Sequence, residues 1–139
     1  MRLTLEIDYA FRIVRHLAQV EGEVVGAPII SEIEAVPVRF TLRILRKLTL
    51  AGITASKRGS QGGYYLNRPK EEITLYDIIL AVDGPIVINK CLMDHGECSK
   101  NGIRGRGRCL FHQKLGAMQE EIIRMFSTCT IDEFIDGPR

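Results

Sequence analysis

The sequence predicts a mainly α-helical protein with a small β-hairpin wing, in the order of a winged helix-turn-helix followed by a long helix. Apolar residues recur at steps of three and four over the first fifty or so positions, which indicates amphipathic helices. A glycine-rich turn then separates two short runs rich in Ile, Thr and Tyr, as in a β-hairpin. Another long amphipathic segment lies near the end of the 139 residues, which suit one domain with an appended helix.

Three helices are expected before the hairpin. The first covers residues 4–21 and is broken by the sequence GEVVGAP. Pro28 suits the first turn of a short second helix that ends near Ala35. Pro37 begins a third helix, which runs to Ala51 and stops before a glycine.

The third helix separates charged from apolar residues. At about 100° per residue, three arginines project from it within about 60° of one another: Arg39, Arg43 and Arg46. The opposite side is aliphatic and contains Ile44, Leu45 and Leu48. A helix of this kind can pack on a core while it contacts phosphates.

The hairpin should consist of two strands, Ile53–Ser56 and Tyr64–Asn67, with Lys57 and Arg58 at its tip. A helix capped by Thr74 follows it. A longer helix is expected from about Leu110 to Ser127. Its apolar stripe contains Phe111, Leu115, Met118, Ile122 and Phe126. Thr130 and Glu133 then form a capping box for a terminal helical turn.

The charge of the chain is unevenly distributed. Residues 35–70 contain eight basic residues and no Asp or Glu, whereas the remaining chain contains eleven basic and seventeen acidic residues. A basic block on an acidic remainder indicates a polyanionic partner. Because the block coincides with the third helix and the hairpin, we expect double-stranded DNA, with the helix in the major groove and the hairpin at the neighbouring backbone or minor groove. The expected contacts are Arg39, Arg43, Arg46, Lys47, Lys57 and Arg58.

The apolar stripe of the last long helix has no obvious cover within a chain of this length. Pairing with its copy in a second protomer would cover it, and a two-fold homodimer would present two recognition helices to a pseudo-palindromic operator. The alternative is that the helix folds back on its own domain. We therefore expect a winged helix-turn-helix DNA-binding domain over residues 1–84, a cysteine segment over 85–109, and a dimerisation helix with a C-terminal turn over 110–139.

Three of the four cysteines, Cys91, Cys98 and Cys109, lie within nineteen residues of a segment rich in glycine and arginine. Thiols gathered in a polar segment can hold an iron–sulfur cluster or a metal ion. The spacing C-x6-C-x10-C lacks the C-x2-C pair of many zinc sites, so zinc ranks second. Cys129 lies between apolar residues and is expected to be a small buried side chain.

This set is one ligand short, and three residues compete for the fourth position. His112 follows Cys109 by three positions, so both side chains share a face at the start of a helix, and imidazole replaces thiolate in some iron–sulfur sites. His95 lies inside the cysteine segment. Asp8, on the first helix, could reach the cluster only through tertiary or dimer contacts, and its harder oxygen would make one iron more exchangeable.

Four stretches make the chain similar to a known family. The sequences MRLTLEIDYAFRIVRHLA, SKRGSQGGYYL and ITLYDIILAVDG, together with the three-cysteine segment, resemble the Rrf-type family of bacterial winged-helix regulators, which includes IscR, NsrR and RirA. The resemblance implies that the three cysteines ligate an iron–sulfur cluster, that Arg58 lies at the wing tip, and that the last long helix mediates dimerisation. The sequence CLFH at 109–112 is similar to IscR, where the histidine completes a 2Fe–2S site. Asp8 in EIDYA is similar to NsrR, where an aspartate of the partner subunit completes a 4Fe–4S site.

Together these features predict a cytoplasmic, homodimeric transcriptional regulator, in the first instance a repressor, whose DNA affinity is controlled by an iron–sulfur cluster that senses iron, redox state or nitric oxide. The alternatives are a winged-helix regulator that uses zinc or thiol oxidation and, more remotely, an iron–sulfur carrier, for which the basic block would have no use. We expect no membrane contact, small-molecule substrate or enzymatic activity. The sequence has no long apolar stretch, no nucleophile–base motif and no phosphate-binding glycine loop that opens a helix.

Overall fold

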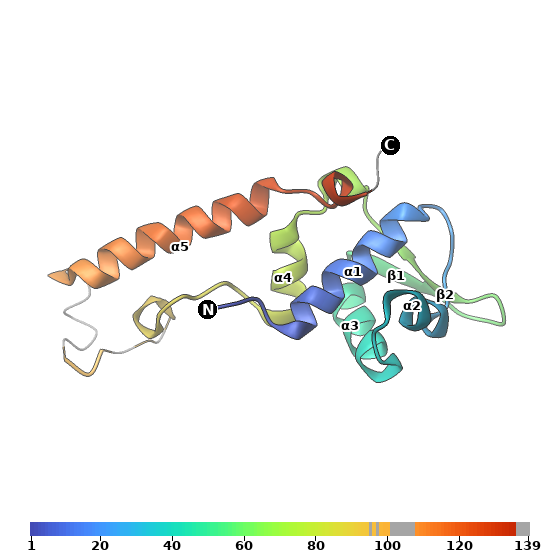
Figure 1. Cartoon of the computed structure of the whole chain (residues 1–139), viewed down its shortest axis with the longest axis horizontal. Helices are drawn as coiled ribbons and strands as arrows, with labels where there is room; N and C mark the ends of the chain where they lie inside the picture. Colours follow the sequence, from blue (N-terminus) through green and yellow to red (C-terminus); the bar gives the residue numbers. More distant parts are fainter. Residues whose placement is uncertain (95, 97, 101–107, 136–139) are drawn as a thin grey trace.

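The protein is mainly α-helical with one two-stranded hairpin, as the sequence predicts (Figure 1). The computed structural model describes residues 1–94, 96, 98–100 and 108–135. The helices are α1 (Leu5–Gln19), α2 (Ala27–Glu34), α3 (Val38–Leu50), α4 (Leu75–Asp83) and α5 (Leu110–Thr128). The strands β1 (Thr54–Lys57) and β2 (Gly63–Leu66) lie between α3 and α4, and the short 3-10 turns are η1 (Lys70–Glu72), η2 (Lys90–Leu92) and η4 (Ile131–Phe134).

The helices begin and end within two positions of the residues predicted from the sequence. At the start of α1, the hydroxyl of Thr4 accepts a hydrogen bond from a first-turn backbone N–H at 3.2 Å. Thr74 and Asp77 form a reciprocal capping box at the start of α4, with both N···O distances at 3.0 Å. Thr130 and Glu133 form the second predicted capping box, which begins the 3-10 turn η4. These hydrogen bonds satisfy backbone N–H groups that a helix start leaves without partners.

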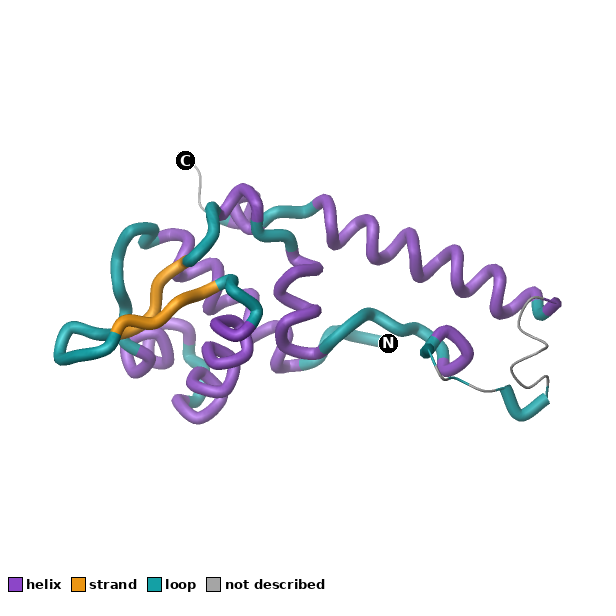
Figure 2. Tube along the Cα trace, turned by 180° about the vertical axis from the view of Figure 1, so that it is seen from behind, coloured by secondary structure: helices purple, strands orange, loops and turns teal. Residues whose placement is uncertain are grey.

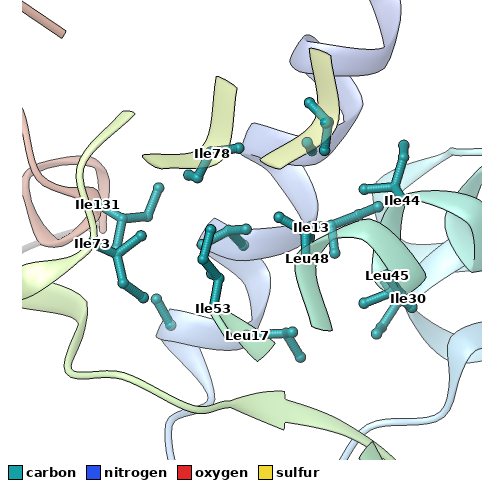
Figure 3. Close-up of a cluster of buried hydrophobic side chains, with 14 of the residues drawn as sticks. Ile13, Leu17, Ile30, Ile44, Leu45, Leu48, Ile53, Ile73, Ile78 and Ile131 are labelled. Atoms are coloured by element: carbon teal, nitrogen blue, oxygen red, sulfur yellow. The ribbon is translucent and has the colours of Figure 1, made fainter. Parts of the chain in front are cut away.

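One hydrophobic core joins the first part of the chain to its C-terminal turn (Figure 3). Its fully buried side chains include Ile13, Leu48, Ile53, Ile78 and Ile131. The backbone N–H of Ile131 donates to the carbonyl of Ile73 at 2.9 Å, and that of Leu75 donates to the carbonyl of Cys129 at 2.9 Å. The segment after α5 therefore returns to the core that α1, α3 and α4 build.

The hairpin is an antiparallel pair in which Thr54 faces Leu66 and Lys57 faces Gly63. A third short segment supports it, because Val25 and Tyr64 exchange two backbone hydrogen bonds of 2.8 Å. A Cβ atom on Gly63 would overlap the carbonyl of Val25, so this close approach requires glycine. The support fixes the base of the hairpin and leaves its tip projecting away from the helices (Figure 2).

Helix α5 extends from the rest of the molecule on the side opposite the hairpin (Figures 1 and 2). None of its nineteen residues is buried. Its middle is attached through Gln119, whose side-chain oxygen accepts a hydrogen bond from the backbone N–H of Ile88 at 2.9 Å. Its end leads back into the core through η4.

The predicted apolar stripe of α5 divides into two faces. Ile122 and Phe126 line a cleft of about 370 Å³ together with Ile7 and Ile79, so this part of the helix packs against its own chain. The sequence predicts dimerisation with back-folding as the alternative, and the second half of α5 shows the back-folding.

The other face of α5 stays exposed and contains Phe111 and Met118 of the predicted stripe together with Met125, which the prediction did not include. These residues are spaced by seven positions, so they lie along one line of the helix. A seven-residue apolar repeat on an exposed face is typical of a helix that pairs with another helix.

Candidate DNA-binding surface and cysteine segment

The exposed face of α3 is strongly basic. Arg39, Arg43 and Arg46 are exposed, while Ile44 and Leu48 on the other side of the helix are buried. The sequence predicts this division, and the packing of α3 follows it. Within the described part of the chain, Arg39 and Arg46 form no ion pair, so their guanidinium groups are available to an anionic ligand.

Arg43 is held more firmly than its two neighbours. Its guanidinium lies 4.8 Å from the centre of the Phe40 ring, and its Nε atom lies 3.5 Å from Oε1 of Glu6. A cation over an aromatic face and beside a carboxylate loses part of its rotational freedom. Arg43 therefore has a defined orientation on the exposed face of α3.

Lys47 occupies a different environment from the arginines. Its ammonium lies 2.8 Å from Oε1 of Glu6 and donates a hydrogen bond to the carbonyl of Val82 at 2.9 Å. Both partners belong to other helices, α1 and α4. The structure therefore groups Lys47 with an interhelical contact, whereas the sequence groups it with the DNA-contacting residues.

The hairpin carries its charges at the tip. Lys57 and Arg58 are exposed and form no ion pair among the described residues. Gly59 has a φ of 110°, which a residue with a side chain rarely adopts. A Cβ atom on Gly62 would overlap the carbonyl of Lys57. These glycines allow the tight turn that presents the two cations.

Asp8, the acidic candidate for cluster ligation, lies on α1 and is already paired. Its Oδ2 accepts a hydrogen bond from Arg12 at 2.6 Å. Arg12 also donates to the carbonyl of Glu34 at 3.3 Å and lies 5.2 Å from the centre of the Tyr9 ring. To bind a metal, Asp8 would therefore have to exchange or share this guanidinium.

The three cysteines lie between α4 and α5 in the chain: one in η2, one after it and one directly before α5. Cys91 belongs to η2, and its sulfur accepts a hydrogen bond from the Asn89 side chain at 3.4 Å. Cys109 is the residue before α5, and Cys91, Cys98 and Cys109 are all partly exposed. The described residues contain no ready-made group of three metal-binding side chains. His95 lies outside the described residues.

His112 lies in the first turn of α5, three positions after Cys109. Its Nδ1 atom is buried and has no hydrogen-bond partner among the described atoms. A buried imidazole nitrogen without a partner is costly, because the group has given up its water. Of the described atoms near Cys109, the Nδ1 atom of His112 most directly fits a missing ligand.

Cys129 is partly exposed like the other three cysteines, so the prediction that it is a buried side chain is wrong, but its surroundings differ from theirs. It follows α5, and its carbonyl accepts a hydrogen bond from the first residue of α4. Partial burial and the neighbouring Glu133 raise the pKa of its thiol. A metal ligand must be a thiolate, so this environment disfavours ligation by Cys129.

A family model for Rrf2, described as an iron-dependent transcriptional regulator, matches residues 3–137. The chain belongs to the Rrf2 family. Rrf2 proteins are DNA-binding transcriptional regulators, so membership agrees with the prediction that the chain is not an enzyme. The Rrf-type resemblance predicted from the sequence is confirmed by this match.

Similar Rrf2 relatives differ in length from the chain. The chain is 34% identical over 91 residues to protein aau3 of Rhizobium meliloti. The aligned region covers 66% of this chain and 59% of aau3. It is 28% identical over 139 residues to IscR of Photorhabdus laumondii, which covers 99% of this chain and 80% of IscR. The chain thus spans about three fifths of aau3 and four fifths of that IscR.

Solved structures show the same winged-helix fold. CymR, described as the global cysteine regulator of B. subtilis, matches with a TM-score of 0.73 and 21% identity over 96% of this chain and 95% of CymR. T. potens IscR matches with a TM-score of 0.74 and 20% identity over 96% of this chain and 85% of that chain. At these identities the likeness concerns the fold, and it does not distinguish between regulators with different signals. In the part of this Rrf2 chain that is described, no helix has the length and apolarity needed to cross a membrane.

One exposed residue of α3, Leu42, is not among the DNA contacts predicted from the sequence. Leu42 lies between Arg39 and Arg46 on the arginine face and is exposed. An aliphatic side chain there can contact the 5-methyl group of thymine in the major groove. The signal was present in the helical spacing, since positions 39, 42, 43 and 46 share one face.

Proposed function

We propose that this chain is a homodimeric Rrf2 regulator that binds double-stranded DNA through α3 and the hairpin, acts as a repressor, and responds to an iron–sulfur cluster. The observation that supports DNA binding best is the set of exposed cations without acidic partners on these two elements: Arg39, Arg46, Lys57 and Arg58. Helix α3 would enter the major groove, and the wing would contact the neighbouring backbone or minor groove. A pseudo-palindromic operator would follow from a two-fold dimer.

The proposal divides the chain by task. Residues 1–84 would contact DNA, residues 85–109 would hold the cluster, and residues 110–139 would supply the dimer helix. The exposed face of α5 with Phe111, Met118 and Met125 supports this role for the helix. Its apolar side chains would be removed from water by the same face of a second copy.

The cluster would be held by Cys91, Cys98, Cys109 and one further ligand. Two features favour His112 for that position: its buried Nδ1 has no partner, and it lies one turn from Cys109. Asp8 is paired with Arg12, and α1 lies away from the start of α5 in the same protomer (Figure 1). Asp8 would therefore have to come from the partner subunit. When bound, an iron–sulfur cluster supplies a redox-active, ligand-sensitive iron centre.

Anaerobic reconstitution followed by absorption and Mössbauer spectroscopy tests the ligand set. We expect a 2Fe–2S spectrum that changes in His112→Ala and persists in Asp8→Ala. Cys129→Ala is the matched control, because its raised thiol pKa disfavours ligation. A cluster that is intact in His112→Ala and lost in Asp8→Ala would transfer the fourth position to Asp8. If the protein takes up neither iron nor sulfide, the proposal that it binds an iron–sulfur cluster is wrong.

Sensing requires that the cluster changes DNA affinity. We expect the loaded and cluster-free forms to differ in their affinity for an operator selected from random DNA by the protein itself. Equal affinities would leave a DNA-binding protein without this signal. The signal (iron, redox state or nitric oxide) follows from which treatment removes the difference in affinity.

A regulator without iron is the second candidate. It is supported by the partly exposed thiols of Cys91, Cys98 and Cys109. Such a protein would use thiol oxidation or zinc at the same residues. Metal analysis of the anaerobically purified protein separates these possibilities.

A further inference from the structure

Glu6 and Lys47 form a joint between three helices. Lys47 projects from α3, Glu6 belongs to the first turn of α1, and the carbonyl of Val82 lies near the end of α4. The ammonium nitrogen lies 2.8 Å from the Glu6 carboxylate and 2.9 Å from the Val82 carbonyl. The side chains of Lys47 and Glu6 retain 35% and 19% of their exposure, so most of this contact is withdrawn from water.

Lys47 donates a hydrogen bond to a carbonyl of α4 that has no N–H partner within the helix. The last four carbonyls of an α-helix have no N–H partner within the helix, and Val82 is the penultimate residue of α4. A cation at this end also interacts favourably with the helix dipole. If Lys47 reached for a DNA phosphate, it would leave both the carbonyl and the Glu6 carboxylate without their cation.

The same carboxylate oxygen also faces Arg43. The distance from Oε1 of Glu6 to Nε of Arg43 is 3.5 Å, and Phe40 supports the guanidinium from the other side at 4.8 Å. Glu6 is therefore shared between a lysine that joins the helices and an arginine on the exposed face of α3. A shift of the Glu6 carboxylate would change both the position of α3 against α1 and the orientation of Arg43.

We propose that Glu6 and Lys47 are positioning residues for DNA recognition, and that Lys47 does not contact DNA. The joint fixes α3 against α1 and α4 and orients Arg43 before DNA is bound. Because specific contacts require precise placement and phosphate contacts tolerate more displacement, the joint contributes to binding of the operator and not of random DNA. This inference rests on the proposed function of α3.

Lys47→Met in the full chain tests the proposal, since methionine keeps an unbranched stem and removes the charge. Binding to the selected operator and to a random duplex of equal length is measured by fluorescence anisotropy between about 50 and 200 mM salt. We expect operator affinity to fall about tenfold, because part of the binding free energy must then order α3 and Arg43. Random-DNA affinity and the slope of log affinity against log salt should stay unchanged.

Lys57→Met is the matched control, because it removes one exposed lysine charge from the wing. If Lys57 contacts phosphate, Lys57→Met should weaken binding to both duplexes. It should also lower the slope of log affinity against log salt by about one. If Lys47→Met behaves in the same way, Lys47 contacts phosphate and the inference is overturned. If Lys57→Met and Arg39→Ala are both silent, or the wild-type protein binds no duplex, the proposed function of α3 and the wing fails, and the inference fails with it.

A double-mutant cycle tests whether the two residues act through each other. Glu6→Gln keeps the size of the side chain, and the pair Glu6→Gln/Lys47→Met should lose no more operator affinity than the weaker-binding single variant. Losses that add would mean that the residues act separately and would overturn the joint. Titration of the active fraction excludes a folding defect, which lowers the amount of binding-competent protein and leaves the ratio of operator to random affinity unchanged.

Discussion

Met118→Ala should weaken the dimer if the exposed face of α5 is the interface. Met118 lies in the middle of this face and is 57% exposed in the single chain. Full burial of such a side chain contributes about 1.5–3 kcal/mol, so burying the exposed part contributes about 0.9–1.7 kcal/mol. A two-fold interface contains the residue twice, which gives about 1.7–3.4 kcal/mol and raises the dissociation constant about 20- to 300-fold. Alanine is the best helix former, so the helix itself should not suffer.

Sedimentation equilibrium over a range of protein concentrations measures the dissociation constant. Ile33→Ala is the matched control: Ile33 is an equally exposed aliphatic residue, at 59%, and it lies on α2. We expect Ile33→Ala to leave the dimer unchanged. If Met118→Ala has no larger effect than Ile33→Ala, or the wild-type chain is monomeric at micromolar concentration, the pairing of α5 is refuted.

Three further outcomes follow from individual residues. Replacing operator thymines by deoxyuridine removes only the 5-methyl group. At one position or more it should weaken DNA binding by the wild-type protein and leave binding by Leu42→Ala unchanged. Equal losses of affinity in both proteins would mean that Leu42 does not contact a thymine methyl group. Gly63→Ala should lower the free energy of unfolding by about 1–3 kcal/mol in thermal melts, because its Cβ would overlap the carbonyl of Val25; Gly22→Ala, where no atom crowds the new Cβ, is the control and should cost less. Cys129 should react with iodoacetamide at pH 8 more slowly in the folded than in the unfolded protein, because the raised pKa leaves less thiolate; equal rates would contradict the effect of burial.

The fold was predictable because local signals agreed with the tertiary packing. The caps at Thr4, Thr74 and Thr130 each mark a helix or turn start in the structure. The opposed faces of α3 follow from its helical period. The return of Ile131 to the core was not predictable in this way, because it depends on contacts between segments far apart in the chain.

The candidate site was predictable by residue type and less so by role. Arg39 and Arg46 are exposed and unpaired among the described residues, as expected for groups that bind phosphate. Lys47 has the same charge, but its two partners come from α1 and α4, and no pattern within α3 reveals them. Leu42 is not marked by charge, so the basic pattern of α3 does not reveal it. Glu6 is not marked either, because its contacts to Arg43 and Lys47 join residues about forty positions apart in the chain.

The return of the chain to its own core has a consequence for the apoprotein. Ile73 and Ile131, hydrogen-bonded through their backbones, are 58 positions apart, and α4 between them packs in the same core. The core is therefore closed at both ends by contacts that lie outside the cysteine segment. A chain stripped of any metal should still melt as one cooperative unit, at a lower temperature than the loaded protein, because a ligand that binds only the folded state stabilises it.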